Sequence, residues 1–249
     1  MGNGYQHQQQ AEREAHVRSA RKLQLTLLRH GEPDWTPGGG LAVDNAGLTE
    51  FGRAQARAAA QALARHGVDA IYVSPLRRAQ ETALPLAEAT GVAPITLEAL
   101  AEIGLRFGGM TQEEVDRRFV EASRRPLSEH WEGWPSGENF RAFHARVTGG
   151  LNHLLALHNI TPEPHSEFTI WHHPPDARLS LVIVAHGGTN AVLLTQLLDV
   201  QPVPWEWLRF ESELAAYSVV QARPLGPRGT VWSLQNFNEL DHLRAAGLR

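Results

Sequence analysis

The chain has no cysteine among its 249 residues. This excludes disulfide bonds, a catalytic thiol and thiolate metal sites. The sequence also lacks any apolar run of the length that a membrane-spanning helix requires. The polar residues 1–22, MGNGYQHQQQAEREAHVRSARK, lack the apolar centre of a signal peptide. We therefore expect a cytoplasmic protein, with a flexible segment over residues 1–22 and a single domain over residues 23–249.

An excess of basic charge is also absent, because 23 Lys and Arg residues are outnumbered by 27 Asp and Glu residues, for a net charge of −4. A surface without a basic field gives no reason to expect binding to nucleic acid. No sequence feature indicates a membrane partner. Hydrophobic residues make up 42% of the chain, which is enough for the core of one domain of this length.

Strand and helix patterns alternate along the chain. Apolar runs at 23–28, 69–74 and 179–185 predict strands, and a short strand is expected near residues 93–98. Two further strands, at 213–223 and 230–237, are separated by a Pro/Gly turn. Such alternation predicts an α/β protein, a three-layer α/β/α sandwich with a mainly parallel sheet. The expected helices lie at 48–67, 77–91, 111–123, 136–158 and 189–200, with Thr49, Thr111 and Ser136 as N-caps of three of them.

Polar residues whose burial costs free energy follow three of the predicted strands. The first ends in Arg29-His30-Gly31, the strand 179–185 ends in His186-Gly187-Gly188, and residues 75–78 read PLRR. Because the carboxyl ends of parallel strands meet at one edge of a sheet, we expect these groups to lie close together. Arginine side chains and helix N-termini bind phosphoryl oxygens, and a neutral imidazole can attack phosphorus. Nearby arginines favour that neutral form by lowering the pKa of a histidine. The pattern therefore predicts a phosphoryl-transfer site.

A metal site is the alternative for the same histidines. His30 and His186 could ligate a metal ion with a carboxylate as the third ligand. The neighbouring arginines would repel a cation, and the sequence contains no close spacing of ligands. The phosphoryl-transfer interpretation is therefore favoured, with no metal ion and no cofactor.

Five segments carry a resemblance to a known family. LLRHGEPDW, LTEFGRAQA, SPLRRAQETA, PSGEN and LVIVAHGGTN, in this order, resemble the histidine phosphatase superfamily, which has the phosphoglycerate mutase-like fold. The resemblance runs from about residue 23 to residue 243. It implies a phosphate ester as substrate and phosphohistidine as intermediate.

The resemblance also implies roles for individual residues. His30 would accept the phosphoryl group, and the phosphoryl oxygens would be bound by Arg29, Arg78, His186 and the backbone N–H of Gly187. Glu102, in LAEIG, would be the general acid. Ser74 would support His30, and Glu138 would orient an arginine or His186, whereas Arg77 would face solvent.

This sequence departs from the family pattern at two places. Pro33 and Thr36 stand where many members have Thr and Asn, so one side-chain amide to the phosphate is missing. Arg106 replaces the glycine that usually follows four residues after the acid, in a segment that is one residue shorter. Glu32 is therefore an alternative to Glu102 as the acid.

We expect a phosphatase acting on a small phosphorylated metabolite. A mutase is the second hypothesis, but the arginine- and tyrosine-rich segment of the phosphoglycerate mutases is not found; a catalytically idle phosphate-binding module is the third. The insertion at 159–180 would form a lid or plain surface, and a homodimer is left open. Four tryptophans in loop-like segments would line an aromatic wall or pack under loops: Trp35, Trp131, Trp134 and Trp171.

Overall fold

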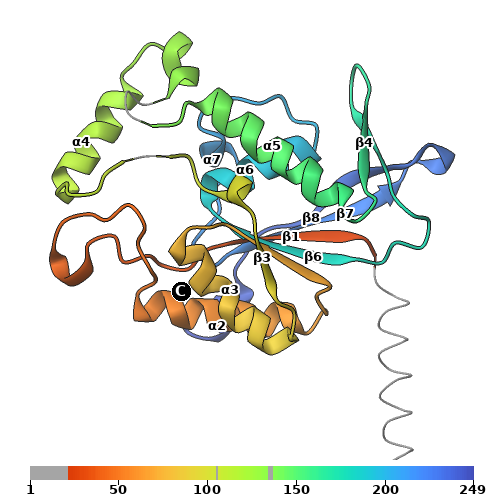
Figure 1. Cartoon of the computed structure of the whole chain (residues 1–249), viewed down its shortest axis with the longest axis horizontal. Coiled ribbons are helices and arrows are strands. Elements are labelled where there is room, and N and C mark those ends of the chain that lie inside the picture. Colours follow the sequence, from red (N-terminus) through yellow and green to blue (C-terminus); the bar gives the residue numbers. More distant parts are fainter. Residues whose placement is uncertain (1–21, 105, 134–136) are drawn as a thin grey trace, which may run out of the picture.

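The computed structural model describes residues 22–104, 106–133 and 137–249, which fold around one eight-stranded sheet (Figure 1). The strand order is β3-β2-β6-β1-β7-β8-β5-β4. The expected flexible segment therefore lies outside the described residues, apart from Lys22. The strands are β1 (Gln24–Arg29), β2 (Ala70–Val73), β3 (Pro94–Thr96), β4 (Thr161–Pro164), β5 (Thr169–His172), β6 (Ser180–Ala185), β7 (Tyr217–Pro224) and β8 (Thr230–Glu239).

The sheet has a parallel half and an antiparallel half. Strands β3, β2, β6 and β1 are parallel, and β7, β8, β5 and β4 continue the sheet in antiparallel pairs. The α/β class is confirmed, but the expectation of a mainly parallel sheet needs correction, since parallel pairing is limited to the core. The physical reason is that short connections, such as the turn between β7 and β8, can join only antiparallel neighbours.

Helices cover both faces of the parallel half (Figure 1). On one face, Val182 and Val184 of β6 belong to an apolar cluster with α2 and α3. On the other, Leu181 and Ile183 belong to a cluster with α5 and α6. The period of two along β6 thus explains why this strand is apolar at every position. The helices of the described chain are α2 (Glu50–Ala64), α3 (Arg77–Thr90), α4 (Gln112–Ser123), α5 (Phe140–Ala156), α6 (Gly187–Leu197), α7 (Glu206–Arg209) and α8 (Asp241–Ala245).

Helix caps fix where these helices begin. Thr49 accepts a hydrogen bond from the Gly52 N–H, and Thr111 forms a capping box with Glu114, as the sequence predicts for both caps. The N-cap of α5 is Asn139 instead of Ser136, which lies outside the described residues. Asparagine caps as well as serine does, and Asn139 immediately precedes the apolar face of the helix.

The insertion at 159–180 contains the β4–β5 hairpin, which extends the sheet beyond β8. In Figure 1 this hairpin lies at the opposite end of the molecule from α4. Trp171 of β5 is fully buried and its ring centroid lies 6.1 Å from that of Trp232, so it packs in the core. Trp131 also packs against the core, whereas Trp134 lies outside the described residues.

Within the described ranges, no helix has both the length and the apolar character that crossing a lipid bilayer would require. A cytoplasmic location and a homodimer stay predictions, because neither is tested by the fold of one chain.

Candidate active site

The two motif histidines lie next to each other at the carboxyl ends of adjacent strands. Strands β1 and β6 are parallel neighbours, and Arg29 pairs with Ala185 in their register. The following residues, His30 and His186, are therefore side by side, with ring centroids 5.1 Å apart. Only 4% of His30 and 0% of His186 is exposed. The sheet thus brings together two groups that are separated by more than half of the chain.

His30 has its Nε2 atom free of a proton. Its Nδ1 lies 2.8 Å from the Gly31 carbonyl oxygen, which can only accept, so Nδ1 carries the hydrogen. Nε2 then accepts a hydrogen bond from Nε of Arg78 at 3.3 Å. Burial, together with the charges of Arg78 and Arg29, holds the pKa of His30 well below its ordinary value. At neutral pH the imidazole is therefore neutral and has a lone pair on Nε2.

Two arginines flank this imidazole, and each has a buried N–H donor without a hydrogen-bond partner among the described residues. Nε of Arg29 and Nη1 of Arg78 are buried and have no hydrogen-bond partner among the described residues. Arg29 also donates to the Ser212 carbonyl, and the Arg78 guanidinium lies 4.7 Å from the ring centroid of Trp35. Burial lowers the pKa of Arg78 to about 10, so it stays charged at neutral pH. Because an unpaired buried donor is costly, these two atoms indicate a place for an anion.

Ser74 was expected to support His30, but the structure places it against His186 instead. Its Oγ lies 2.7 Å from Nε2 of His186. The reason is the strand order: β2 pairs with β6 and not with β1, so the residue after β2 lies beside the residue after β6. Burial and the nearby cationic groups lower the pKa of His186 well below its ordinary value. Its Nδ1 is a further buried atom without a described hydrogen-bond partner.

Glu102 lies between the strand ends and the start of α6. Its carboxylate accepts hydrogen bonds from the N–H groups of Gly188, at 2.9 Å, and Ile103, at 3.0 Å. A Cβ on Gly188 would lie 2.6 Å from Oε1, so a larger residue here would force the Glu102 carboxylate to move. Helix α6 begins at Gly187, two residues earlier than expected, and this places Gly187, the first residue of the helix, beside Arg29.

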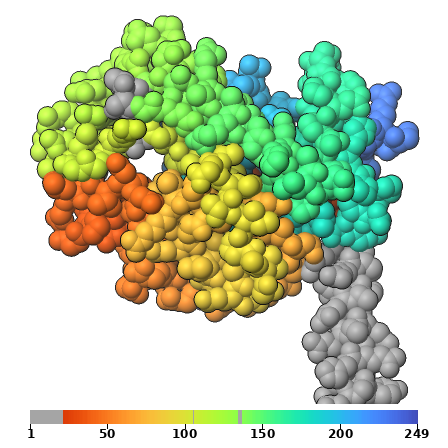
Figure 2. All heavy atoms as spheres, viewed as in Figure 1, coloured from red at the N-terminus to blue at the C-terminus, as the bar shows by residue number. Residues whose placement is uncertain are grey.

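These groups meet at a cavity of about 1000 Å³. His30, Arg29, Arg78 and Glu102 line its inner end. The loop after β1 and the segment that leads into α4 form its outer walls, and Figure 2 shows the hollow between them. Glu32 does not line the cavity, because its carboxylate accepts a hydrogen bond from Thr49 at the start of α2. No group of three or more potential metal ligands occurs within the described part of the chain.

The sequence model of the family described as "Histidine phosphatase superfamily (branch 1)" matches residues 25–162, more than half of the chain. The chain belongs to the histidine phosphatase superfamily. Phosphoserine phosphatase 1 of Hydrogenobacter thermophilus is 32% identical over 204 residues, which cover 80% of this chain and 86% of that protein.

Two further relatives of this histidine phosphatase cover most of its length. The native structure of mycobacterial glucosyl-3-phosphoglycerate phosphatase is 28% identical, with a TM-score of 0.63, and covers 88% of this chain and 99% of that one. The protein named "Probable phosphoglycerate mutase GpmB" from Cronobacter sakazakii is 27% identical over 240 residues, covering 91% of this chain and 97% of that protein. The phosphatase activity and the mutase-like fold expected from the sequence agree with these relatives.

Glu138 orients an arginine, but not one that the sequence singled out. Its carboxylate binds Arg146 of α5 twice, at 2.8 and 2.6 Å. Arg146 in turn donates to the carbonyls of Ala99 and Ala101, just before Glu102. The pair therefore holds the segment that leads to Glu102. The only sequence feature that could have indicated Arg146 is its place at the border of the apolar face of α5.

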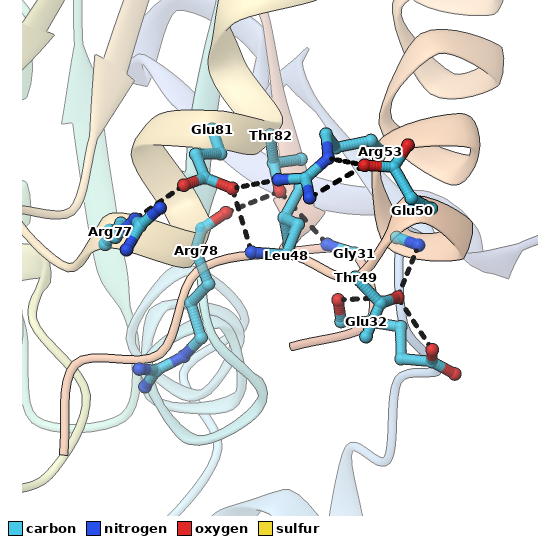
Figure 3. Close-up of polar contacts among 11 residues, drawn as sticks. Gly31, Glu32, Leu48, Thr49, Glu50, Arg53, Arg77, Arg78, Glu81 and Thr82 are labelled. Atoms are coloured by element: carbon cyan, nitrogen blue, oxygen red, sulfur yellow. Dashed lines mark hydrogen bonds and ion pairs between the residues drawn. The ribbon is translucent and has the colours of Figure 1, made fainter. Parts of the chain in front are cut away.

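No role was predicted for Thr82, which links α3 to His30-Gly31, named the histidine loop below. The Gly31 N–H donates to Thr82 Oγ1 at 3.0 Å, and the same hydroxyl donates to the Arg78 carbonyl at 2.7 Å (Figure 3). Thr82 is fully buried. By contrast, Arg77 points away from this link, toward Glu81, and its side chain is 64% exposed, as expected.

Proposed function

We propose that His30 is the nucleophile of a phosphatase that hydrolyses phosphate monoesters of small organic metabolites. The observation that carries the proposal is the neutral, buried His30, whose Nε2 lone pair lies among unsatisfied donors of Arg29 and Arg78. A phosphoryl group at that place would accept hydrogen bonds from these donors while its phosphorus faces the imidazole. The names of two of the relatives, both phosphatases of small metabolites, support the substrate class.

The reaction would proceed in two displacements. His30 Nε2 attacks phosphorus, the N–P bond forms, and the ester P–O bond breaks as Glu102 gives a proton to the leaving oxygen. Water then attacks the phosphohistidine, gives its proton to Glu102, and releases inorganic phosphate and free His30. Arg29, Arg78, His186 and the N–H of Gly187 would bind the phosphoryl oxygens throughout.

The arginines would supply the positive charge that a metal ion supplies in other phosphotransferases. Incubation with a strong chelator should therefore leave the rate unchanged. Activity that is lost on chelation and returns with zinc or magnesium would revive the metal interpretation.

The test is to replace His30 and to follow the phosphoryl group. Wild type quenched in alkali during turnover should retain phosphate on His30, and His30→Ala should release no phosphate from any ester in a panel. His153→Ala, on an exposed histidine of α5, is the matched control and should behave as wild type. Phosphate on another residue, or release that survives in His30→Ala, would overturn the proposal.

A mutase is the second candidate, favoured by the Cronobacter relative. A mutase would return the phosphoryl group to its own product instead of to water. Phosphoglycerate incubated with the enzyme therefore separates the two candidates. Inorganic phosphate as the main product supports a phosphatase, and an isomeric phosphoglycerate as the main product supports a mutase.

A further inference from the structure

The cavity is much larger than a phosphoryl group needs. Its volume of about 1000 Å³ is at the upper end of pockets that enclose whole organic ligands. The phosphoryl-binding donors occupy only the inner end, where the strands finish. The rest of the cavity is available to the alcohol part of the ester, and its lining residues determine which alcohols fit.

The outer walls of the cavity are joined to each other. Asp44, in the loop after β1, accepts hydrogen bonds from the N–H groups of Phe107 and Gly108, both at 2.7 Å. Two backbone hydrogen bonds of 2.9 Å also connect Ala42 with Gly109 and Met110. Arg106 lies immediately before this joined segment and lines the cavity. The position of its backbone is therefore defined by contacts that cross the cavity mouth.

Each acidic side chain that lines the cavity already accepts a hydrogen bond from the protein. The donors are the Phe107 and Gly108 N–H groups for Asp44, Gly188 and Ile103 for Glu102, Gln112 for Asp116, and Arg146 for Glu138. Arg106, which is exposed, differs from them because it makes no hydrogen bond or ion pair with any described residue. It is thus a cation on the outer wall that no residue of the described part of the chain neutralises.

We infer that Arg106 binds a carboxylate of the substrate, so that the substrates are phosphate esters of hydroxy acids or hydroxy amino acids. The inference rests on the proposed function, in which Arg29 and Arg78 hold the phosphoryl group. A guanidinium matches the two oxygens of a carboxylate with two parallel N–H groups. A carboxylate carries one negative charge, which one guanidinium balances, whereas a phosphate dianion carries two. Arg106 is then a specificity residue that touches the leaving alcohol and not the reacting atoms.

The experiment compares esters that differ only in the carboxylate. Phosphoserine is paired with phosphoethanolamine, and phosphoglycerate with glycerol phosphate, and kcat/KM is measured for each. Wild type should favour the carboxylate-bearing member by about tenfold, the worth of one charge-assisted hydrogen-bonded pair near the surface. Because the ratio is taken within one variant, any general change in activity cancels.

Arg106→Gln should bring this ratio close to one, and Arg106→Lys, which keeps the charge without the fork, should retain part of it. Arg57→Gln removes an exposed arginine of α2 that does not line the cavity, and it should keep the wild-type ratio. Equal rates for both members in wild type, or a ratio that survives in Arg106→Gln, would overturn the inference while leaving the phosphatase intact. If wild type releases no more phosphate than His30→Ala from any ester, the proposed function fails, and the inference fails with it.

Discussion

The inner end of the cavity and its outer rim are built in opposite ways. At the inner end, His30 and Arg78 are each 4% exposed, and they follow parallel strands whose register fixes their positions. At the rim, Trp35 is 42% exposed and Phe119 is 39% exposed, and they come from a loop and from α4. The proposed phosphoryl chemistry would thus lie on rigid elements, and the proposed selection of the alcohol on segments that can vary without disturbing it.

The two regions also differ in what holds them. The inner residues are held by packing, by a hydrogen bond from the end of β1 to α3, and by one between the residues that follow β2 and β6. The rim is held by a few backbone hydrogen bonds and by one aspartate. We therefore expect substitutions at the inner end to reduce turnover, and substitutions at the rim to change substrate preference.

Among substitutions at the inner end and the rim, Glu102→Gln is expected to reduce turnover the most. The change keeps the shape of the side chain and removes the proton that the leaving oxygen needs. Turnover of esters with poor leaving groups should fall roughly 10²–10⁴-fold. An ester of p-nitrophenol needs little protonation and should lose less in its first step. If both classes fall equally, and Glu32→Gln shows the difference between them, the acid is Glu32.

A smaller effect at the inner end is expected for Thr82→Val. The substitution keeps the volume but leaves the buried N–H of Gly31 without an acceptor, at a cost of about 1–3 kcal/mol in the free energy of unfolding. It also breaks the link that runs from Gly31 through Thr82 to the Arg78 carbonyl, so kcat should fall about tenfold while KM changes less. Thr82→Ser keeps the hydroxyl and should restore kcat.

Thr90→Val is the control for this change, because Thr90 also donates to a carbonyl four residues back in α3 but has no contact with the histidine loop. An equal loss of kcat in Thr90→Val would mean that Thr82 acts only through the stability of the helix.

The pH dependence of stability should separate the buried histidines from the exposed ones. The folded-state pKa values of His30 and His186 lie well below the ordinary value, with burial as the first cause. Below about pH 6.5 these two histidines therefore bind protons in the unfolded chain but stay neutral in the folded chain. Each histidine should then reduce the free energy of unfolding by about 1.4 kcal/mol per pH unit as the pH falls toward its folded-state pKa.

The measurement is denaturant unfolding of wild type and variants between pH 7.5 and about 5. His30→Asn should have a smaller slope than wild type, and His153→Asn, on an exposed histidine, should keep the wild-type slope. Equal slopes for all three proteins would contradict the buried, neutral state of His30.

The sequence predicted the inner end well because strand periodicity and the rule on strand ends are local. Arg29, His30 and His186 follow apolar strands, and their meeting required only that these strands be parallel neighbours. The partner of Ser74 was missed because it depends on the strand order, and no local pattern encodes that β2 pairs with β6. In the antiparallel half, β7 and β8 were predicted as two strands joined by a turn, whereas β4 and β5 were not predicted, because each has only four residues.

The rim could not be predicted, because its contacts join segments that have no regular structure. Asp44 and the N–H groups of Phe107 and Gly108 are about sixty residues apart in the chain. Nothing in either segment has a period that would indicate the other. One of the two interpretations placed the tryptophans around the substrate, and Trp35 in the loop after β1 does line the cavity. Trp35 also contacts the guanidinium of Arg78 at the inner end.

The smallest effect is expected at the rim, for Asp44→Ala. The change removes the side-chain acceptor that joins the loop after β1 to the segment before α4, at a cost of about 1 kcal/mol because these bonds are exposed. KM for an ester whose alcohol fills the outer cavity should rise about fivefold, and amide hydrogen exchange at residues 107–110 should become faster by a similar factor. Asp44→Asn keeps an acceptor and should show less of both effects, and Asp241→Ala, on an exposed aspartate of α8, should show neither. If Asp44→Ala instead lowers kcat as much as Thr82→Val does, the rim helps to place the reacting groups, and the division between a chemical inner end and a selective rim is wrong.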